Sequence, residues 1–344
     1  MRCIAAEIGR RIGSLDPGYF ALVMATGIIS NVFFLQGQRT LSDALFALNL
    51  AAYGCLWLLT IVRAARFTAA LRADLTSPNR VFLFFTMVAA TDVLGVSLAL
   101  RGFGSATLVL WLVACALWLG LTYLGFAVYL FRNAGGTDVI GGAWLNAIVG
   151  TQSLAILGGA AALPAMQAAP QAFVLLPALW AVGLGLYAIL IVLLANRMFF
   201  APVAPESVEP LLWVVMGAAA ISVNAGVVVA SDGAVTPFLQ SLRPFFAAVT
   251  LGVWAWATWW IPLLVLIGLW KHGLHRLPIR YTPMLWSMVF PLGMYAAATL
   301  RLSRLADLPA LITWSQTMAW VALAAWAVTA VGLIAAAAAS ARRS

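Results

Sequence analysis

Long apolar runs alternate with short polar connections along the whole chain. The apolar runs cover residues 17–36, 43–64, 79–100, 105–131, 142–163, 171–197, 210–230, 245–270, 281–302 and 310–339. Each run is long enough to cross a hydrocarbon core of about 30 Å as an α-helix. The alternating segments of about ten residues that are typical of membrane β-barrels do not occur. The pattern therefore predicts an all-α integral membrane protein with ten transmembrane helices.

The composition supports this class. Of the 344 residues, 64% are hydrophobic and 8% are charged, whereas a soluble domain carries about 25% charged residues. The longest polar connection, 63–80, leaves no room for a soluble catalytic domain. The run at 17–36 is too long for the core of a signal peptide, so we interpret it as the first span. We expect one transmembrane domain, 1–344, with short tails at 1–16 and 340–344.

The basic residues predict the orientation. The N-terminal tail, the connections after even-numbered spans and the C-terminal tail hold fourteen of the nineteen Lys and Arg residues. Because cytoplasmic loops carry the excess of positive charge, both termini are expected in the cytoplasm of an inner (plasma) membrane protein. The net charge of +9 is explained by this rule, so no nucleic-acid partner is expected.

Polar residues concentrate at the centres of the odd-numbered spans. At mid-depth such groups are costly against lipid, so they face neighbouring helices or a wet cavity. The candidate pore-lining residues are Thr26, Gly27, Ser30, Thr91, Asp92, Thr151, Gln152, Ser153, Ser222, Asn224, Gly226 and Ser287. Close helix packing through small and polar residues is the alternative interpretation. The even-numbered spans are rich in Leu and Trp and are expected to face lipid, with Trp111, Trp118, Trp254, Trp256, Trp259 and Trp260 in that wall.

The starts of the odd-numbered spans are nearly evenly spaced. They fall near residues 17, 79, 142, 210 and 281, which indicates a weak internal repeat of five helical hairpins. The simplest architecture is an inner ring of five odd-numbered helices, surrounded by the even-numbered ones, around a central pore.

Two features of the inner spans carry candidate chemistry. Asp92 is the only formally charged side chain near mid-depth. It is either protonated and hydrogen-bonded to a neighbouring helix or titrated during proton-coupled transport. Pro291 lies at the centre of the ninth span, between Phe290 and Gly293. A proline kink can push a side chain inward, so Phe290 is a candidate hydrophobic gate, the alternative being an ordinary lipid- or core-facing Phe.

Enzymatic and metal chemistry have no support. The three cysteines, Cys3, Cys55 and Cys115, lie far apart, and His272 and His275 belong to a basic loop. The sequence contains no HExxH, GxSxG or Gly-rich phosphate loop. We therefore expect no catalytic residue, no metal and no cofactor.

Several segments resemble the tellurite-resistance/dicarboxylate transporter family, which includes bacterial TehA, fungal malate and sulfite permeases and plant slow anion channels. The most specific are PGYFALVMATGIIS at 17–30 and WSMVFPLGMY at 286–295, with TQS at 151–153 and WWIPLL at 259–264 in support. The family has a Thr after Ile-Ser in its seventh helix, and this chain has Val223 there.

The resemblance implies a quasi-fivefold ring of five hairpins, a central pore and a homotrimer. It also implies that the pore phenylalanine of the ninth helix is Phe290. The expected partners are a small anion and membrane lipid. The first-helix segment is most similar to the dicarboxylate branch, so the expected cargo is a malate-like C4-dicarboxylate. An inorganic-anion channel, a sulfite exporter, a tellurite-resistance protein and a non-transporting membrane scaffold remain alternatives.

Overall fold

The computed structural model describes residues 9–132, 141–167, 174–231 and 236–342, and every regular element within these ranges is a helix. The predicted tail residues 1–8 and 343–344, Cys3 and the first residues of the predicted span 171–197 lie outside them.

The longer helices follow the predicted spans. They are α2 (Phe20–Leu35), α3 (Arg39–Arg66), α5 (Phe85–Ala99), α6 (Gly104–Arg132), α7 (Asn146–Gln167), α8 (Leu175–Phe200), α9 (Val214–Ser231), α11 (Arg243–Gly268), α12 (Trp286–Leu305) and α13 (Ala310–Ala341). Nine stretches of the described chain are long and apolar enough to cross a membrane. The predicted span at 142–163 falls on α7 and its preceding turn, which is not among the nine.

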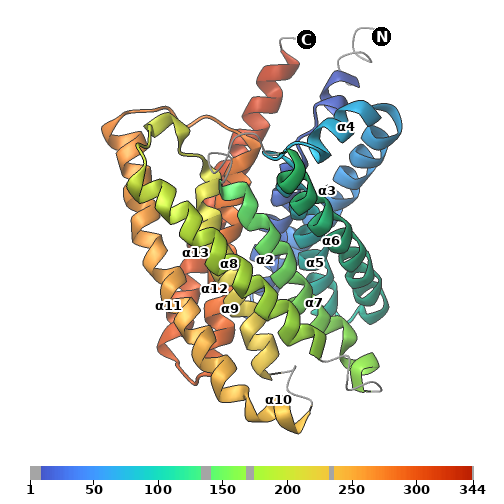
Figure 1. Ribbon diagram of the computed structural model, residues 1–344, viewed down its shortest axis with the longest axis vertical. Helices are drawn as coiled ribbons and strands as arrows, with labels where there is room; N and C mark the ends of the chain where they lie inside the picture. The colour runs from blue at the N-terminus through green and yellow to red at the C-terminus, as the bar shows by residue number, and fades with distance from the viewer. Residues whose placement is uncertain (1–8, 133–140, 168–173, 232–235, 343–344) are drawn as a thin grey trace.

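Short helices fill the connections. They are α4 (Thr68–Leu75), α10 (Pro237–Ser241), the 3-10 turn η6 (Pro205–Ser207) and the π-helical turn η8 (Leu269–Leu274), which extends α11. Figure 1 shows the long helices as a bundle, with the segment before α2 and the C-terminal end of α13 at one end. We call this the terminal end.

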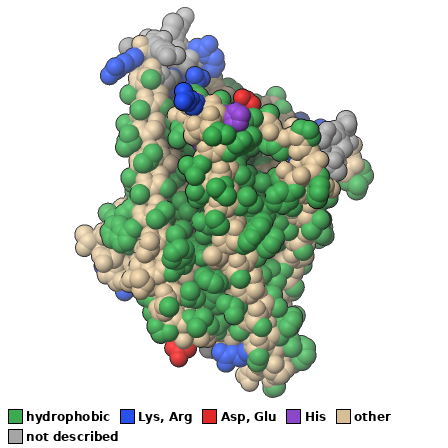
Figure 2. Space-filling model, turned by 90° about the vertical axis from the view of Figure 1, so that its left-hand side faces the viewer, with side chains coloured by type: hydrophobic (Ala, Val, Ile, Leu, Met, Phe, Trp, Pro, Cys, Tyr) green, Lys and Arg blue, Asp and Glu red, His purple; other side chains and the backbone are tan. Residues whose placement is uncertain are grey.

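Burial divides the spans into an inner and an outer set. Within the membrane-length windows, the stretches that contain α2, α5, α9 and α12 are 78–89% buried, whereas those of α3, α6, α8, α11 and α13 are 11–39% buried. Helix α7 is buried from Trp144, in its preceding turn, to Gly159. The expectation that odd-numbered helices lie inside is confirmed by these values. Figure 2 shows one face of the molecule as a broad hydrophobic surface between charged ends.

The inner helices contact one another in a closed sequence. Helix α2 packs against α5, α5 against α7, α7 against α9, α9 against α12, and α12 against α2. Each inner helix also packs against the helix that follows it, namely α3, α6, α8, α11 and α13, respectively (with α10 intervening before α11).

Glycines permit this close packing. A Cβ atom at Gly217 of α9 would lie 2.7 Å from Pro291 Cγ of α12, and one at Gly95 of α5 would lie 2.5 Å from Leu157 Cδ2 of α7. Small residues at such positions let helix backbones approach in a membrane.

All five inner helices begin in the same way. Each is preceded by a 3-10 turn: η1 (Pro17–Tyr19), η2 (Val81–Phe84), η4 (Gly142–Leu145), η7 (Pro210–Trp213) and η9 (Pro283–Leu285). Three of these turns start with proline, which lacks the N–H that would be unsatisfied at a helix start. The turns contact one another in the same closed order as the helices. The five inner helices are therefore parallel, with their N-termini at the terminal end.

Candidate functional site

A large cavity lies at the terminal end, where the five 3-10 turns meet. Its volume is about 840 Å³, and we call it the vestibule. Asp16 before η1, Leu83 of η2, Trp144 of η4, Leu211 of η7 and Met284 of η9 all line it. Because residues in or next to the turn before every inner helix contribute to its wall, the vestibule lies at the N-terminal ends of the inner set. It also extends outward between α8 and α11.

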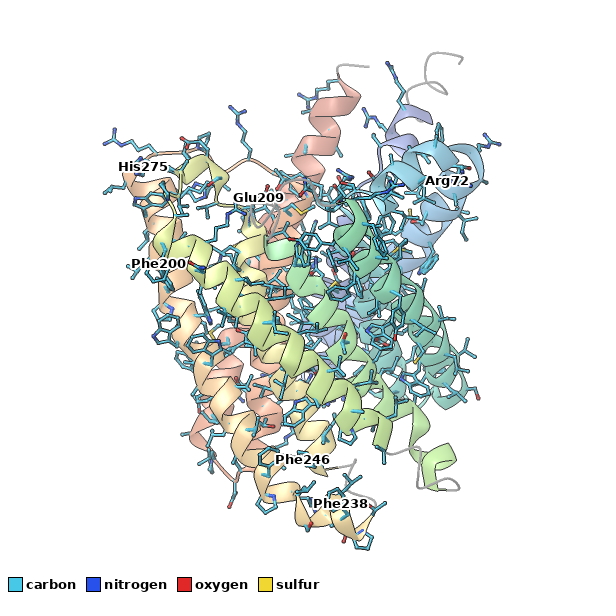
Figure 3. All side chains as sticks on the ribbon, viewed as in Figure 1. Arg72, Phe200, Glu209, Phe238, Phe246 and His275 are labelled. Atoms are coloured by element: carbon cyan, nitrogen blue, oxygen red, sulfur yellow. The ribbon has the colours of Figure 1, made fainter. Side chains whose placement is uncertain are left out.

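Both signs of charge line the vestibule. Arg80 and Arg197 are basic, and Asp16 and Glu209 are acidic; Glu209 is labelled at the terminal end in Figure 3. Arg80 Nε lies 2.7 Å from Asp74 Oδ1, and Arg80 Nη2 lies 3.3 Å from Asp16 Oδ2. The side-chain charges therefore largely balance, and the five helix N-termini add positive potential.

A second, smaller cavity lies deeper in the bundle. Its volume is about 20 Å³, and we call it the central cavity. Asn31 of α2, Asp92 of α5, Ser153 of α7, Asn224 of α9 and Arg301 of α12 line it, so all five inner helices meet there as well. A cavity of about 10–15 Å³ is just large enough for one water molecule. The central cavity therefore has room for about one water molecule and is too small for a dicarboxylate.

The carboxyl of Asp92 is the central group of this cavity. Its side chain is 1% exposed. Ser153 Oγ donates a hydrogen bond of 2.6 Å to Asp92 Oδ2, and Asp92 Oδ1 has no hydrogen-bond partner among the described residues. The expected bond from Asp92 to a neighbouring helix is therefore present, with α7 as that neighbour.

Two carboxamides stand beside Asp92 on the cavity wall. Asn31 Nδ2 donates to the Val93 carbonyl (3.2 Å), and Ser97 Oγ donates to Asn31 Oδ1 (2.7 Å). Asn224 Nδ2 lies 3.5 Å from Met294 Sδ, and its Oδ1 finds no partner in the part of the chain that the structure describes. The central cavity therefore contains two buried acceptor oxygens without donors, one on Asp92 and one on Asn224.

Two polar residues of the cavity wall, Asn31 and Arg301, are not among the candidates from the sequence, and Arg301 was assigned to the end of the ninth span. The successive spacings in the series Phe290, Met294, Ala297 and Arg301 are four, three and four residues, which places all four on one face of α12. Met294, Ala297 and Arg301 line the central cavity. Counting helical turns along α12 from the candidate gate Phe290 would have identified Arg301 from the sequence.

The apolar stretch 288–293 of α12 lies between Met284, which lines the vestibule, and Met294, which lines the central cavity. It contains Phe290, which is 1% exposed. At a rise of about 1.5 Å per residue, Phe290 lies about 9 Å beyond Met284 and about 6 Å before Met294. Phe290 lines neither cavity. We call this stretch, residues 288–293, the septum; its Pro291 packs against Gly217 of α9.

Most of the other predicted pore-lining residues lie between inner and outer helices. Thr26 accepts from Trp326 Nε1, Thr151 from Trp118 Nε1, and Ser30 bonds Ser42. Thr91 bonds Tyr53, and Gln152 donates to the Trp180 carbonyl. These contacts favour the helix-packing interpretation for these five side chains.

The remaining predicted residues also lie away from the cavity walls. Ser222 Oγ donates to the Ala218 carbonyl of its own helix, and Ser287 is buried. A Cβ at Gly27 would meet Asn49 and Val93, and one at Gly226 would meet Thr250 and Trp180. Gly293 packs against Ile28 and Ile29 of α2.

The lipid-facing role expected for the tryptophans is wrong for several of them. Trp260 is 0% exposed, and Trp111 donates to the Leu154 carbonyl of α7. Trp118 and Trp254 donate to Thr151 and Thr299 of inner helices. An indole N–H needs an acceptor that lipid cannot provide, so these outer helices turn the group inward. Trp256 and Trp259 stay exposed, 40% and 49%.

Comparison with known proteins identifies relatives across nearly the whole chain. The SLAC1 family model, described as a voltage-dependent anion channel, matches residues 14–334. An uncharacterized transporter of Methanocaldococcus jannaschii is 23% identical over 296 residues, 84% of this chain and 84% of its own. A second uncharacterized transporter from that organism is 22% identical over 296 residues, which are 84% of this chain and 83% of that protein. An uncharacterized membrane protein of Mycobacterium tuberculosis H37Rv is 39% identical over 142 residues, 41% of this chain and 72% of that protein.

Proposed function

Because this chain belongs to the SLAC1 voltage-dependent anion channel family, as the resemblance of its first and ninth helices indicated, we propose that it moves small anions across a membrane along the axis of its inner helices. The family is one of channels and transporters, not of enzymes. The observation that carries the proposal is that the central cavity is lined by all five inner helices, and the vestibule by residues at the turns from which these helices start.

The proposed architecture is a ring of five hairpins with ten transmembrane helices, α7 among them. The closed order of contacts among α2, α5, α7, α9 and α12, each with its outer partner, supports this arrangement. A pore on the quasi-fivefold axis would then be lined by one face of each inner helix.

The electrostatics of this path favour anions. Five parallel helices direct the positive ends of their dipoles at the vestibule, and Arg301 adds a positive charge at the central cavity. No lysine or arginine is among the described residues that form the septum between the cavities. Anion binding should therefore be weak, which suits flow through a channel better than tight capture.

Phe290 is the proposed gate of this pore. It shares one face of α12 with three residues of the central cavity, so its ring is directed toward the same axis. An apolar ring that fills a narrow pore excludes water and ions. In this proposal the structure represents the closed state of the pore, because Phe290 lies along α12 between a residue of the vestibule and a residue of the central cavity.

The proposed cargo is a malate-like C4-dicarboxylate. The segment 17–30 supports it through its similarity to the dicarboxylate branch. Chloride or nitrate conduction, sulfite export and tellurite resistance are the alternatives. The test is flux of malate, succinate, sulfite, chloride and nitrate into liposomes that contain purified Phe290→Ala protein. Malate flux above empty liposomes supports the proposal, flux of inorganic anions alone replaces the cargo, and no flux of any anion indicates a non-transporting scaffold.

We place the protein in the inner (plasma) membrane as a homotrimer with both termini in the cytoplasm. The basic residues that gather at the terminal side support the orientation, and the family resemblance supports the trimer. Protease accessibility of terminal tags in spheroplasts tests the first, and native mass spectrometry of the solubilised protein tests the second.

A further inference from the structure

We propose that the central cavity is a proton-controlled anion site, in which Arg301 attracts the anion and the charge on Asp92 decides whether the anion can enter. This inference rests on the proposed anion transport and adds its regulation. It assigns a role to the one acidic group on the cavity wall, which the permeation of anions alone does not require.

The two charged groups share a very small space. Asp92 of α5 and Arg301 of α12 both line the cavity of about 20 Å³. The cavity has room for about one water molecule, so charges on its wall are screened less than they are in bulk solvent. An anion that enters this cavity therefore experiences the charges of both Arg301 and Asp92. Repulsion between like charges a few ångströms apart is strong in such a medium.

The hydrogen bonds at Asp92 leave a place for one proton. Oδ2 accepts from Ser153, and Oδ1 has no partner among the described residues and belongs to a side chain on the cavity wall. When Asp92 takes up a proton at Oδ1 from a hydronium ion, which becomes water, the carboxyl becomes neutral and its O–H can donate a hydrogen bond to an anion. When the proton leaves, the same oxygen repels the anion. No other bond is made or broken.

The groups that surround Asp92 do not replace it in this role. On the packed outer helices, the titratable groups that interact electrostatically with Asp92 are the Tyr53 hydroxyl of α3 and the Cys115 thiol of α6. Tyr and Cys ordinarily titrate near 10 and 8.5. Helices α2 and α7 present Asn31 and Ser153 to the cavity, which do not titrate, and α12 presents Arg301, which stays charged. Asp92 is therefore the group on this wall to which we assign the change of charge.

The experiment measures anion flux in liposomes between pH 5 and 8, with the Phe290→Ala variant as the conducting background. We expect flux to rise as the pH falls, because one proton binds to Asp92. On the alkaline side of the midpoint of this titration, flux should change by roughly tenfold per pH unit. Adding Asp92→Asn should give high flux that no longer depends on pH. Adding Asp43→Asn, which changes an exposed aspartate on α3, should leave the pH profile intact.

The outcomes separate this inference from the proposed function. If Phe290→Ala conducts and its pH dependence survives Asp92→Asn, or if it conducts equally at every pH, the inference is overturned while anion transport stands. If Phe290→Ala carries no anion at any pH, the proposed function fails. Arg301→Gln in the same background should lower flux several-fold at every pH, and unchanged flux would remove Arg301 from the site.

A measurement on the unaltered protein tests the inference even if the Asp92→Asn variant does not fold. Hydrophobic carbodiimides react with protonated carboxyls inside membranes, and mass spectrometry locates the adduct. Labelling at Asp92 should increase several-fold from pH 8 to pH 5. Labelling that stays constant over this range would show that Asp92 does not change charge, which contradicts the inference.

Discussion

Ser153 Oγ donates a hydrogen bond of 2.6 Å to Asp92 Oδ2 and so joins α7 to α5 at the wall of the central cavity. Two inner helices that are separated by α6 in the chain are thereby linked through the acidic group of the proposed pathway. The link accounts for one oxygen of the carboxyl and leaves the other facing the cavity.

Ser153→Ala removes this link. We expect a loss of about 1 kcal/mol in stability, since hydrogen bonds between membrane helices contribute about 0.6–1.7 kcal/mol. Thermal denaturation of the solubilised protein measures it. Ser222→Ala is the matched control, because the Ser222 hydroxyl bonds the backbone of its own helix. Equal losses in the two variants would show that the α5–α7 bond contributes nothing of its own.

Phe290→Ala should open the septum. The ring is buried between the two cavities, and its removal should raise anion conductance several-fold in planar bilayers. Phe33→Ala is the control, because Phe33 is equally buried on α2 but packs edge-on against Trp320 of α13, with ring centroids 5.0 Å apart. Both variants should lose stability through the cavity that they create. Conductance that stays at the level of the unaltered protein, or that rises equally in both variants, would argue against the gate.

Gly217→Ala should disturb the packing beside the septum. The added Cβ would lie 2.7 Å from Pro291 Cγ, so α9 and α12 must move apart. We expect a loss of about 1–3 kcal/mol, as for overpacked cores. Gly185→Ala is the control, because a Cβ at that exposed position of α8 meets no atom within 4 Å. Thermal denaturation compares the two, and a Gly217 variant as stable as the control would contradict the close contact.

Asp74→Ala should weaken the terminal end. Asp74 Oδ2 lies 2.6 Å from Nη2 of Arg63, whose side chain is 4% exposed. A buried charge that loses its partner costs about 3–5 kcal/mol. Asp43→Ala breaks the pair between Asp43, which is 61% exposed, and Arg101, and should cost at most about 1 kcal/mol. Denaturation of both solubilised variants tests the difference, and similar losses would show that burial of Arg63 is unimportant.

The sequence by itself determined the membrane class, the approximate spans and the division into inner and outer helices. These depend on the transfer of each residue into lipid, which is a local property: a run such as 214–231 is apolar enough to insert, and its Ser222 and Asn224 are too polar to face lipid. The basic residues of the connections supplied the expected orientation for the same local reason.

Only the tertiary structure decided which polar side chains meet in the middle. An inner helix is surrounded by neighbours on every side, so polarity alone cannot distinguish its axial face from the face toward its outer partner. Thr26 and Thr151 therefore looked like Asp92 and Ser153, yet they accept hydrogen bonds from outer tryptophans. The rotation and depth of each helix are set by contacts such as Gly217 with Pro291, which join residues far apart in the chain. Those contacts bring Arg301 to the same cavity as Asp92.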